Sequence, residues 1–176
     1  PAVVKYKAGG KGGNLYLEEG TFTYVFYSAD DLARAHDDGD PNLRIRCHAM
    51  KVRLEGATRD GMISGEHMRP GYFNYFLGND PSKWAGNVPG YEEVNYSQVY
   101  DGIGLRLYSA GGQVKYDFIL QPGADLKQIR LAYDGTRGLS LEEGNLDVRA
   151  SGNEISEQKP FGDQLVKGVQ QVVNCR

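Results

Sequence analysis

Residues 94–120 read VNYSQVYDGIGLRLYSAGGQVKYDFIL, and this stretch decides the fold. Asp101-Gly102 separates two runs that are rich in β-branched and aromatic residues, and an Asp-Gly pair in that position is typical of a tight hairpin turn. Gly111-Gly112 ends the second run in the same way. In the third run the larger apolar side chains recur at every second position, which predicts that one face of a strand carries Val114, Tyr116, Phe118 and Leu120. The stretch therefore predicts three antiparallel strands joined by two turns.

The same pattern continues on both sides of this stretch. Residues 15–20 and 21–27 are separated by a Glu-Gly turn and predict a hairpin. Ser28 and Asp31 have the spacing of a capping box, with Asp in place of Glu, so a short helix is expected to follow them. The turn at 122–125 leads into a strand over 129–133. Further short strands are expected at 139–141, 146–150, 154–159 and 165–173, with a bend at 160–163.

A further strand is predicted over residues 43–55, where apolar and charged residues alternate. We expect an antiparallel strand with one side facing the core and a basic side facing solvent. The inward residues are expected to be Leu43, Ile45, Cys47 and Ala49. The outward residues are expected to be Arg44, Arg46 and His48, with Lys51, Arg53 and Glu55 continuing the polar face.

Many short strands joined by glycine-rich turns predict an all-β fold, an antiparallel β-sandwich with one short helix and a helical turn. The length of 176 residues fits a single domain over 1–176. Glycines at 9–13 make 1–13 a flexible N-terminal segment in this interpretation. The chain opens abruptly at Pro1, as expected if a signal peptide has been removed from it.

Composition limits the kinds of partner. The net charge is −3 and the pI is about 5.6, whereas nucleic-acid binding needs clustered positive charge. The longest apolar runs fall short of the roughly 18 residues of a membrane-spanning helix. We therefore expect neither a nucleic-acid partner nor a membrane span.

Residues that could support catalysis or metal binding are few. His36, His48 and His67 share no ligand spacing, and the acidic loop at 37–42 lacks the full calcium-binding pattern. Motifs of nucleophilic catalysis and phosphate binding are also missing. The sequence thus predicts no cofactor, no metal site and no catalytic residue, and a protein that is not an enzyme.

The aromatic segment Tyr72–Tyr91 holds the only Trp of the chain. Asn79 or Asp80 can cap a helical turn that begins at Pro81, a residue whose φ suits the first helical position. Large amphipathic rings serve in ligand contacts and equally in cores. The binding hypothesis names Trp84, Tyr72, Tyr75 and Tyr91, and the alternative is that these rings pack in the interior.

Cys47 and Cys175 are too few for a disulfide scaffold. In an oxidising compartment they could form one disulfide, and closing so long a loop would remove about 4–5 kcal/mol of unfolded-state entropy. Two free thiols are the alternative interpretation.

The motifs also resemble a bacterial family, the N-terminal β-rich domain of secreted proteins, mainly from Bacteroidetes, that carry SBBP-type repeats or gliding-motility and type IX secretion sorting domains. The family pattern N-Y-F-x-G-N-D-P-S-K-W matches residues 74–84, followed by matches at Asn87, Pro89 and Tyr91. V-Y-x-G-I-x-L matches 99–105, and Y-D-F followed by P-G-A-D matches 116–118 and 122–125. Further matches lie at 14–19, 129–131 and 159–160. Asp101 and Gly104 depart from the family, which often has Pro and Asp there.

This resemblance implies a non-catalytic module, extracellular or at the cell surface, for display, docking or adhesion in a larger exported protein. Its partners are expected to be other domains of that protein, or a surface glycan or protein. The alternative is a carbohydrate-binding or carbohydrate-active domain that uses an aromatic platform with paired carboxylates, where Asp117 with Glu92 or Glu93 are the candidate acids. A third possibility is a purely structural spacer.

Overall fold

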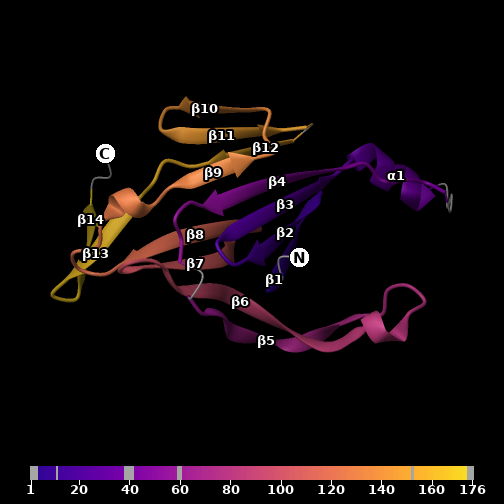
Figure 1. The fold of residues 1–176 in the computed structure, drawn as a ribbon, viewed down its shortest axis with the longest axis horizontal. Coiled ribbons are helices and arrows are strands. Elements are labelled where there is room, and N and C mark those ends of the chain that lie inside the picture. Colours follow the sequence, from indigo (N-terminus) through magenta and orange to yellow (C-terminus); the bar gives the residue numbers. More distant parts are fainter. Residues whose placement is uncertain (1–3, 11, 38–41, 59–60, 152, 174–176) are drawn as a thin grey trace. The chain divides into compact units, whose positions relative to one another are not determined.

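The computed structural model describes residues 4–10, 12–37, 42–58, 61–151 and 153–173. One α-helix, two 3-10 turns and fourteen strands make up this part of the chain (Figure 1). Four sheets are formed, in the strand orders β1-β2-β3-β4-β9, β5-β6-β7-β8, β10-β11-β12 and β13-β14. The fold is all-β, as the sequence predicted, with antiparallel pairing wherever a register is described.

The first two sheets contain β1 (Tyr6–Gly10), β2 (Gly13–Glu18), β3 (Thr21–Tyr27), β4 (Cys47–Leu54), β9 (Leu131–Asp134), β5 (Ile63–Tyr75), β6 (Ala85–Tyr100), β7 (Ile103–Ala110) and β8 (Gln113–Leu120). The other two contain β10 (Gly138–Glu142), β11 (Asn145–Ala150), β12 (Asn153–Glu157), β13 (Gly162–Val166) and β14 (Val169–Val173). The helical elements are α1 (Ala29–Asp37), η1 (Pro81–Lys83) and η2 (Leu126–Gln128).

Two compact units divide the chain: Pro1–Tyr24 with Lys51–Ala132, and Val25–Met50 with Tyr133–Arg176. In the first unit two sheets pack face to face, because the Phe22 ring of β3 lies against Tyr96 of β6 and Tyr116 of β8, each at 6.3 Å between ring centroids. Buried aliphatic side chains from both sheets complete this core: Leu15, Leu17, Val52, Leu54, Val99, Ile103, Leu105 and Leu107.

Both predicted hairpin turns of residues 94–120 are present. Tyr100 pairs with Ile103 across Asp101-Gly102, and Ala110 pairs with Gln113 across Gly111-Gly112. Both glycines of the second turn have positive φ, +61° and +77°, a conformation that costs glycine little and other residues much.

The predicted inward face of residues 43–55 is wrong. Met50, Val52 and Leu54 are buried, whereas Cys47 and Ala49 are exposed. In the sequence the apolar residues change from odd to even positions at Met50. A regular strand can bury either its odd-numbered or its even-numbered side chains on one face, but not both. The three larger apolar side chains at the even positions determine which face is buried.

Two other predictions differ from the structure. The single strand expected over 165–173 is a hairpin of β13 and β14, because Lys167 and Gly168 adopt positive φ and reverse the chain. Within the segment 1–13 that was expected to be flexible, β1 pairs with β2 along its whole length. Residues 1–3 lie outside the described residues.

Candidate functional site

An exposed apolar surface of the first unit lies on the β5–β6 hairpin. The part of β6 that precedes Glu93 pairs with β5 and not with β7, so residues 68–91 form a two-stranded extension that we call the aromatic arm (Figure 1). Isolated two-stranded hairpins are marginally stable in water, so the aromatic arm needs contacts beyond its own ladder.

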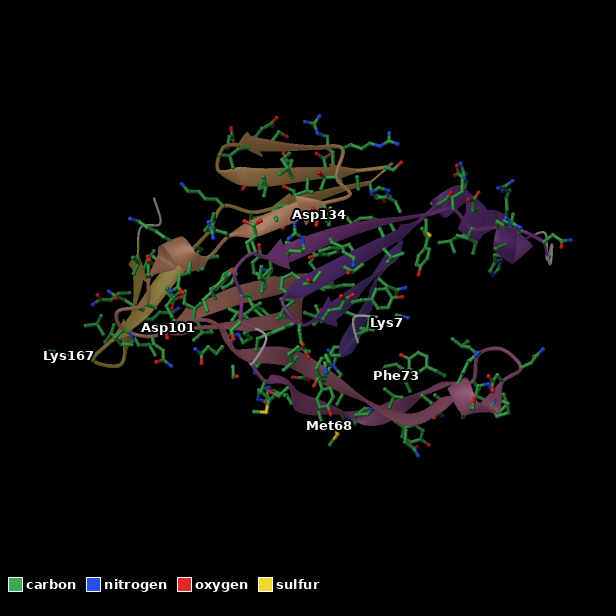
Figure 2. The ribbon with its side chains drawn as sticks, in the orientation of Figure 1. Lys7, Met68, Phe73, Asp101, Asp134 and Lys167 are labelled. Carbon is green, nitrogen blue, oxygen red and sulfur yellow. The ribbon has the colours of Figure 1, made fainter. Side chains whose placement is uncertain are left out.

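Large apolar side chains of the aromatic arm face solvent. The exposed fraction is 63% for Tyr72 and 58% for Phe73, against 2% for the core residue Phe22. The side chains of Met68, Phe76 and Leu77 are exposed as well. Figure 2 labels two of these residues, Met68 and Phe73, on the arm. Contiguous exposed apolar side chains of this kind mark interaction sites more often than scattered single ones do.

The tip of the aromatic arm is fixed by a capped 3-10 turn, as the sequence predicted. Asp80 is the N-cap of η1 and its carboxylate accepts hydrogen bonds from the backbone N–H and the hydroxyl of Ser82, at 3.1 and 2.7 Å. These bonds hold the pKa of Asp80 below its usual value. Lys83 adds an ion pair with Asp80 at 3.3 Å.

Trp84 follows this turn and is held in one orientation. Its indole Nε1 donates a hydrogen bond to the carbonyl of Gly78 at 3.2 Å, and its ring packs edge-on against Phe76 at 5.6 Å between centroids. Its exposed fraction is 43%. Trp84 is therefore neither a core residue nor freely mobile, and it offers a fixed, half-exposed ring.

The N-cap gives a first prediction. Asp80→Ala is expected to loosen η1 and so to shift the fluorescence emission of Trp84, the only Trp, to longer wavelength as the indole gains water contact. Asp125→Ala is the matched control, because Asp125 caps η2 through the backbone N–H of Lys127 in the same way but has no Trp beside it. An equal shift in both variants would show that the emission does not report η1.

Tyr75 and Tyr91 of the same segment lie near β1. Tyr91 is half-buried, contacts Tyr6 of β1 edge-on at 5.9 Å, and occupies the space above Gly65. Lys7 of β1 lies 6.0 Å from the centre of the Tyr75 ring. The four residues of the binding hypothesis are thus divided: Tyr72, Tyr75 and Trp84 are exposed, and Tyr91, which lies opposite Met68, supports the base of the arm.

The candidate acids do not gather around one pocket. Asp117 of β8 accepts a hydrogen bond from Arg106 of β7 at 2.6 Å. Glu93 of β6 pairs with Tyr108 of β7, and its carboxylate is 3.9 Å from the ring Nδ1 of His67. Neither Asp117 nor Glu92 nor Glu93 lines either of the two pockets described in the structure.

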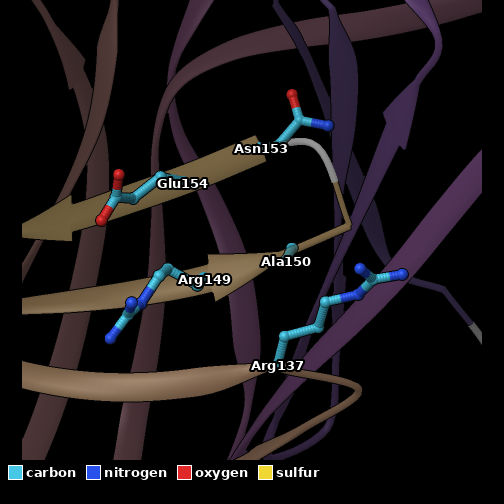
Figure 3. Close-up of a pocket in the computed structure, with 5 residues that line it drawn as sticks. All are labelled: Arg137, Arg149, Ala150, Asn153 and Glu154. Carbon is cyan, nitrogen blue, oxygen red and sulfur yellow. The ribbon is translucent and has the colours of Figure 1, made fainter.

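The larger of these pockets lies in the second unit and has a volume of about 540 Å³. Its lining combines Arg137, Arg149, Ala150, Asn153 and Glu154. The guanidinium groups of the two Arg residues point apart, as Figure 3 shows, and Arg149 Nη2 lies 3.4 Å from the Ser140 hydroxyl. The two positive charges therefore do not converge on one ligand position.

The predicted metal and disulfide residues give no further site. In the described ranges, no three or more His, Cys, Asp or Glu residues are grouped to hold a metal ion. His48 Nε2 lies 2.6 Å from the carbonyl of Gly135. Cys47 is exposed, while Cys175 and most of the acidic loop at 37–42 fall outside the described residues, so the disulfide stays a prediction.

Sequence reasoning missed the exposure of Met68, Phe73, Phe76 and Leu77. The only local sign is that apolar residues occupy consecutive positions at 72–73 and 75–77, so they cannot all lie on one face of a strand. It also missed Asp31, which is fully buried on α1 and bound by Arg34 and Arg46.

Comparison with known proteins gives a family match. A family model described as "Domain of unknown function (DUF7948)" matches residues 1–176. No curated protein and no solved structure matches the chain. Among the described residues, no helix is long and apolar enough to cross a membrane.

Proposed function

The chain belongs to the DUF7948 family, a domain of unknown function, and on that premise we propose that it is a non-catalytic binding module that docks through the aromatic arm. The observation that carries the proposal is the exposure of Tyr72, Phe73 and Phe76 on the arm, together with the fixed ring of Trp84, which packs against Phe76. Aromatic side chains with few rotatable bonds supply large contact areas at low entropic cost, and Trp and Tyr dominate binding hot spots.

The occupant that we propose is a neighbouring domain of the same exported protein. The charged side chains of η1 compensate each other in the Asp80–Lys83 pair, so the tip offers a neutral, mainly apolar surface. Such a surface suits a protein partner with an apolar patch better than a charged polymer. Export, surface location and a link to SBBP-type or type IX secretion proteins are part of the same proposal and rest on the motif resemblance at 74–91.

The test is a double variant of the arm, Tyr72→Ala with Trp84→Ala. We expect the far-UV circular dichroism and the melting temperature to stay close to those of the parent, and binding to the adjoining domain to weaken about 30-fold or more, the range of hot-spot residues. The control is Phe161→Ala, since Phe161 is 71% exposed and lies outside the arm. Binding of the parent and of both variants to intact cells and to a glycan array is measured in the same way.

Each outcome has a defined meaning. If the double variant unfolds, the arm residues are structural and the docking proposal is wrong. If the variant folds and binds as the parent does, the partner uses another surface. If only the glycan array responds to the variant, the carbohydrate-binding alternative replaces docking to a protein domain.

A further inference from the structure

A second surface of the first unit, separate from the aromatic arm, has the features of a ligand site. It is a pocket of about 220 Å³ on the β6–β7–β8 sheet. Asn95, Ser97, Ile119 and Gln121 surround it and Gly104 lies among them, with the buried residues Tyr96 and Leu105 also in its lining. We call it the outer-face pocket.

An irregularity of β6 creates this pocket. Tyr96 pairs with Leu105 and Tyr100 pairs with Ile103, so three residues of β6 lie opposite Gly104 alone. A Cβ atom at position 104 would come within 3.2 Å of the Tyr96 carbonyl oxygen and 3.3 Å of the Ser97 carbonyl oxygen. Glycine thus permits the close approach of the two strands and leaves the pocket without a side chain at that position.

Polar groups at the pocket have hydrogen-bonding capacity to spare. In the part of the chain that the structure describes, the side-chain amides of Asn95 and Gln121 have no hydrogen-bond partner. Arg106 lies directly opposite Asn95 in the register, and its Nε is buried without a partner. Of these groups only Arg106 Nε is buried, and Arg106 does not line the pocket. The amides of Asn95 and Gln121 are open to solvent, and each offers a donor and an acceptor. Two free amides beside one pocket point to a ligand with several hydroxyl or carbonyl groups.

Charge and shape narrow the chemical class of this ligand. The pocket lining contains no charged side chain, and the positive charge of Arg106 is compensated by Asp117 at 2.6 Å. Ile119, which is 51% exposed, adds an apolar contact. A volume of about 220 Å³ is below the roughly 300–1,000 Å³ of sites for drug-sized ligands. We propose that the outer-face pocket binds a single ring of a neutral sugar, with the ring hydroxyls at the two amides and an apolar ring face on Ile119.

This inference goes beyond docking through the aromatic arm and does not depend on it. The test is titration of the ¹⁵N-labelled chain with the methyl glycosides of glucose, galactose and mannose, followed by amide chemical shifts. A ligand of about 13 non-hydrogen atoms in an open pocket is expected to bind with a Kd of about 1 mM. Shifts are expected at Ser97, Gly104 and Gln121.

Two variants test the pocket itself. Asn95→Leu and Gln121→Ala each remove one amide and are expected to raise the Kd about 2- to 10-fold, the range for one hydrogen bond. Gln113→Ala is the matched control, because Gln113 is an exposed glutamine at the opposite end of β8. Gln121 is itself exposed, so its variant is expected to fold even if Asn95→Leu does not.

The remaining outcomes overturn the proposal. It is wrong if none of the three glycosides shifts these amides at about 10 mM, roughly ten times the expected Kd. It is also wrong if glycoside shifts persist unchanged in both variants, or if they centre on Tyr72 and Trp84. Equally strong shifts with inorganic phosphate would assign the pocket to anions held by Arg106 in place of a neutral sugar.

Discussion

Phe22→Ala is expected to lower the free energy of unfolding by about 3–5 kcal/mol, the range for removing a large aromatic side chain from a core. The Phe22 ring is 2% exposed and lies between Tyr96 and Tyr116, so it joins the two sheets of the first unit. Folded proteins are stable by only about 5–15 kcal/mol in total. The variant is therefore expected to be partly unfolded at moderate temperature.

Urea denaturation followed by far-UV circular dichroism measures this effect. Phe73→Ala is the matched control, because Phe73 belongs to the same unit and is 58% exposed. Its effect on the free energy of unfolding is expected to stay within about 0.5 kcal/mol. Equal losses in the two variants would show that Phe22 does not join the sheets.

The fold class was predictable from residues 94–120 because each turn has its own chemical signature. Gly102, Gly111 and Gly112 supply the positive φ values of these tight hairpins, and both turns occur where the sequence placed them. The Asp80 cap of η1 was predictable for the same reason. Its hydrogen bonds reach Ser82, only two residues along the chain.

Predictions failed where the outcome depended on other parts of the chain. Apolar and polar residues alternate as regularly over 43–49 as over 50–54. Only the packing of Met50, Val52 and Leu54 decides that the even-numbered side chains are buried. Lys167-Gly168 lacks the turn signature of an Asp-Gly pair, so the sequence predicts one strand where the structure has the hairpin of β13 and β14.

The candidate site was predictable only in part. The sequence pointed to the segment 72–91, but it could not tell that Tyr91 packs against Tyr6 while Tyr72 is exposed. The outer-face pocket depends on the register between Tyr96 and Tyr100, which only the pairing of β6 with β7 fixes. Neither feature leaves a local signature in the sequence.

Substitution of Asp31 is expected to cause the second large loss of stability. Its side chain is fully buried and its carboxylate accepts hydrogen bonds from the Arg46 backbone N–H at 2.9 Å and from Arg46 Nε at 2.8 Å. The Arg34 guanidinium donates a further bond at 2.6 Å. Asp31→Ala leaves the Arg46 backbone N–H without its acceptor, whereas the side chains of Arg34 and Arg46 are 58% and 74% exposed and their guanidinium groups can bind water instead. The melting temperature is expected to fall by about 5 °C or more.

The pH dependence tests the same carboxylate. The hydrogen bonds from Arg46 lower the pKa of Asp31 far below the usual range. Because the folded pKa is lower than the unfolded value of about 4, Asp31 stabilises the fold fully above that pH and loses this effect as the pH falls towards the folded pKa. Melting temperatures measured from about pH 5 down to about pH 2 are expected to fall less steeply in Asp31→Asn than in the parent.

Asp30→Asn is the control, since Asp30 is exposed on the same helical turn and its variant is expected to keep the parent's slope. Parallel slopes for Asp31→Asn and the parent would show that Asp31 is not the buried, ionised partner of Arg46.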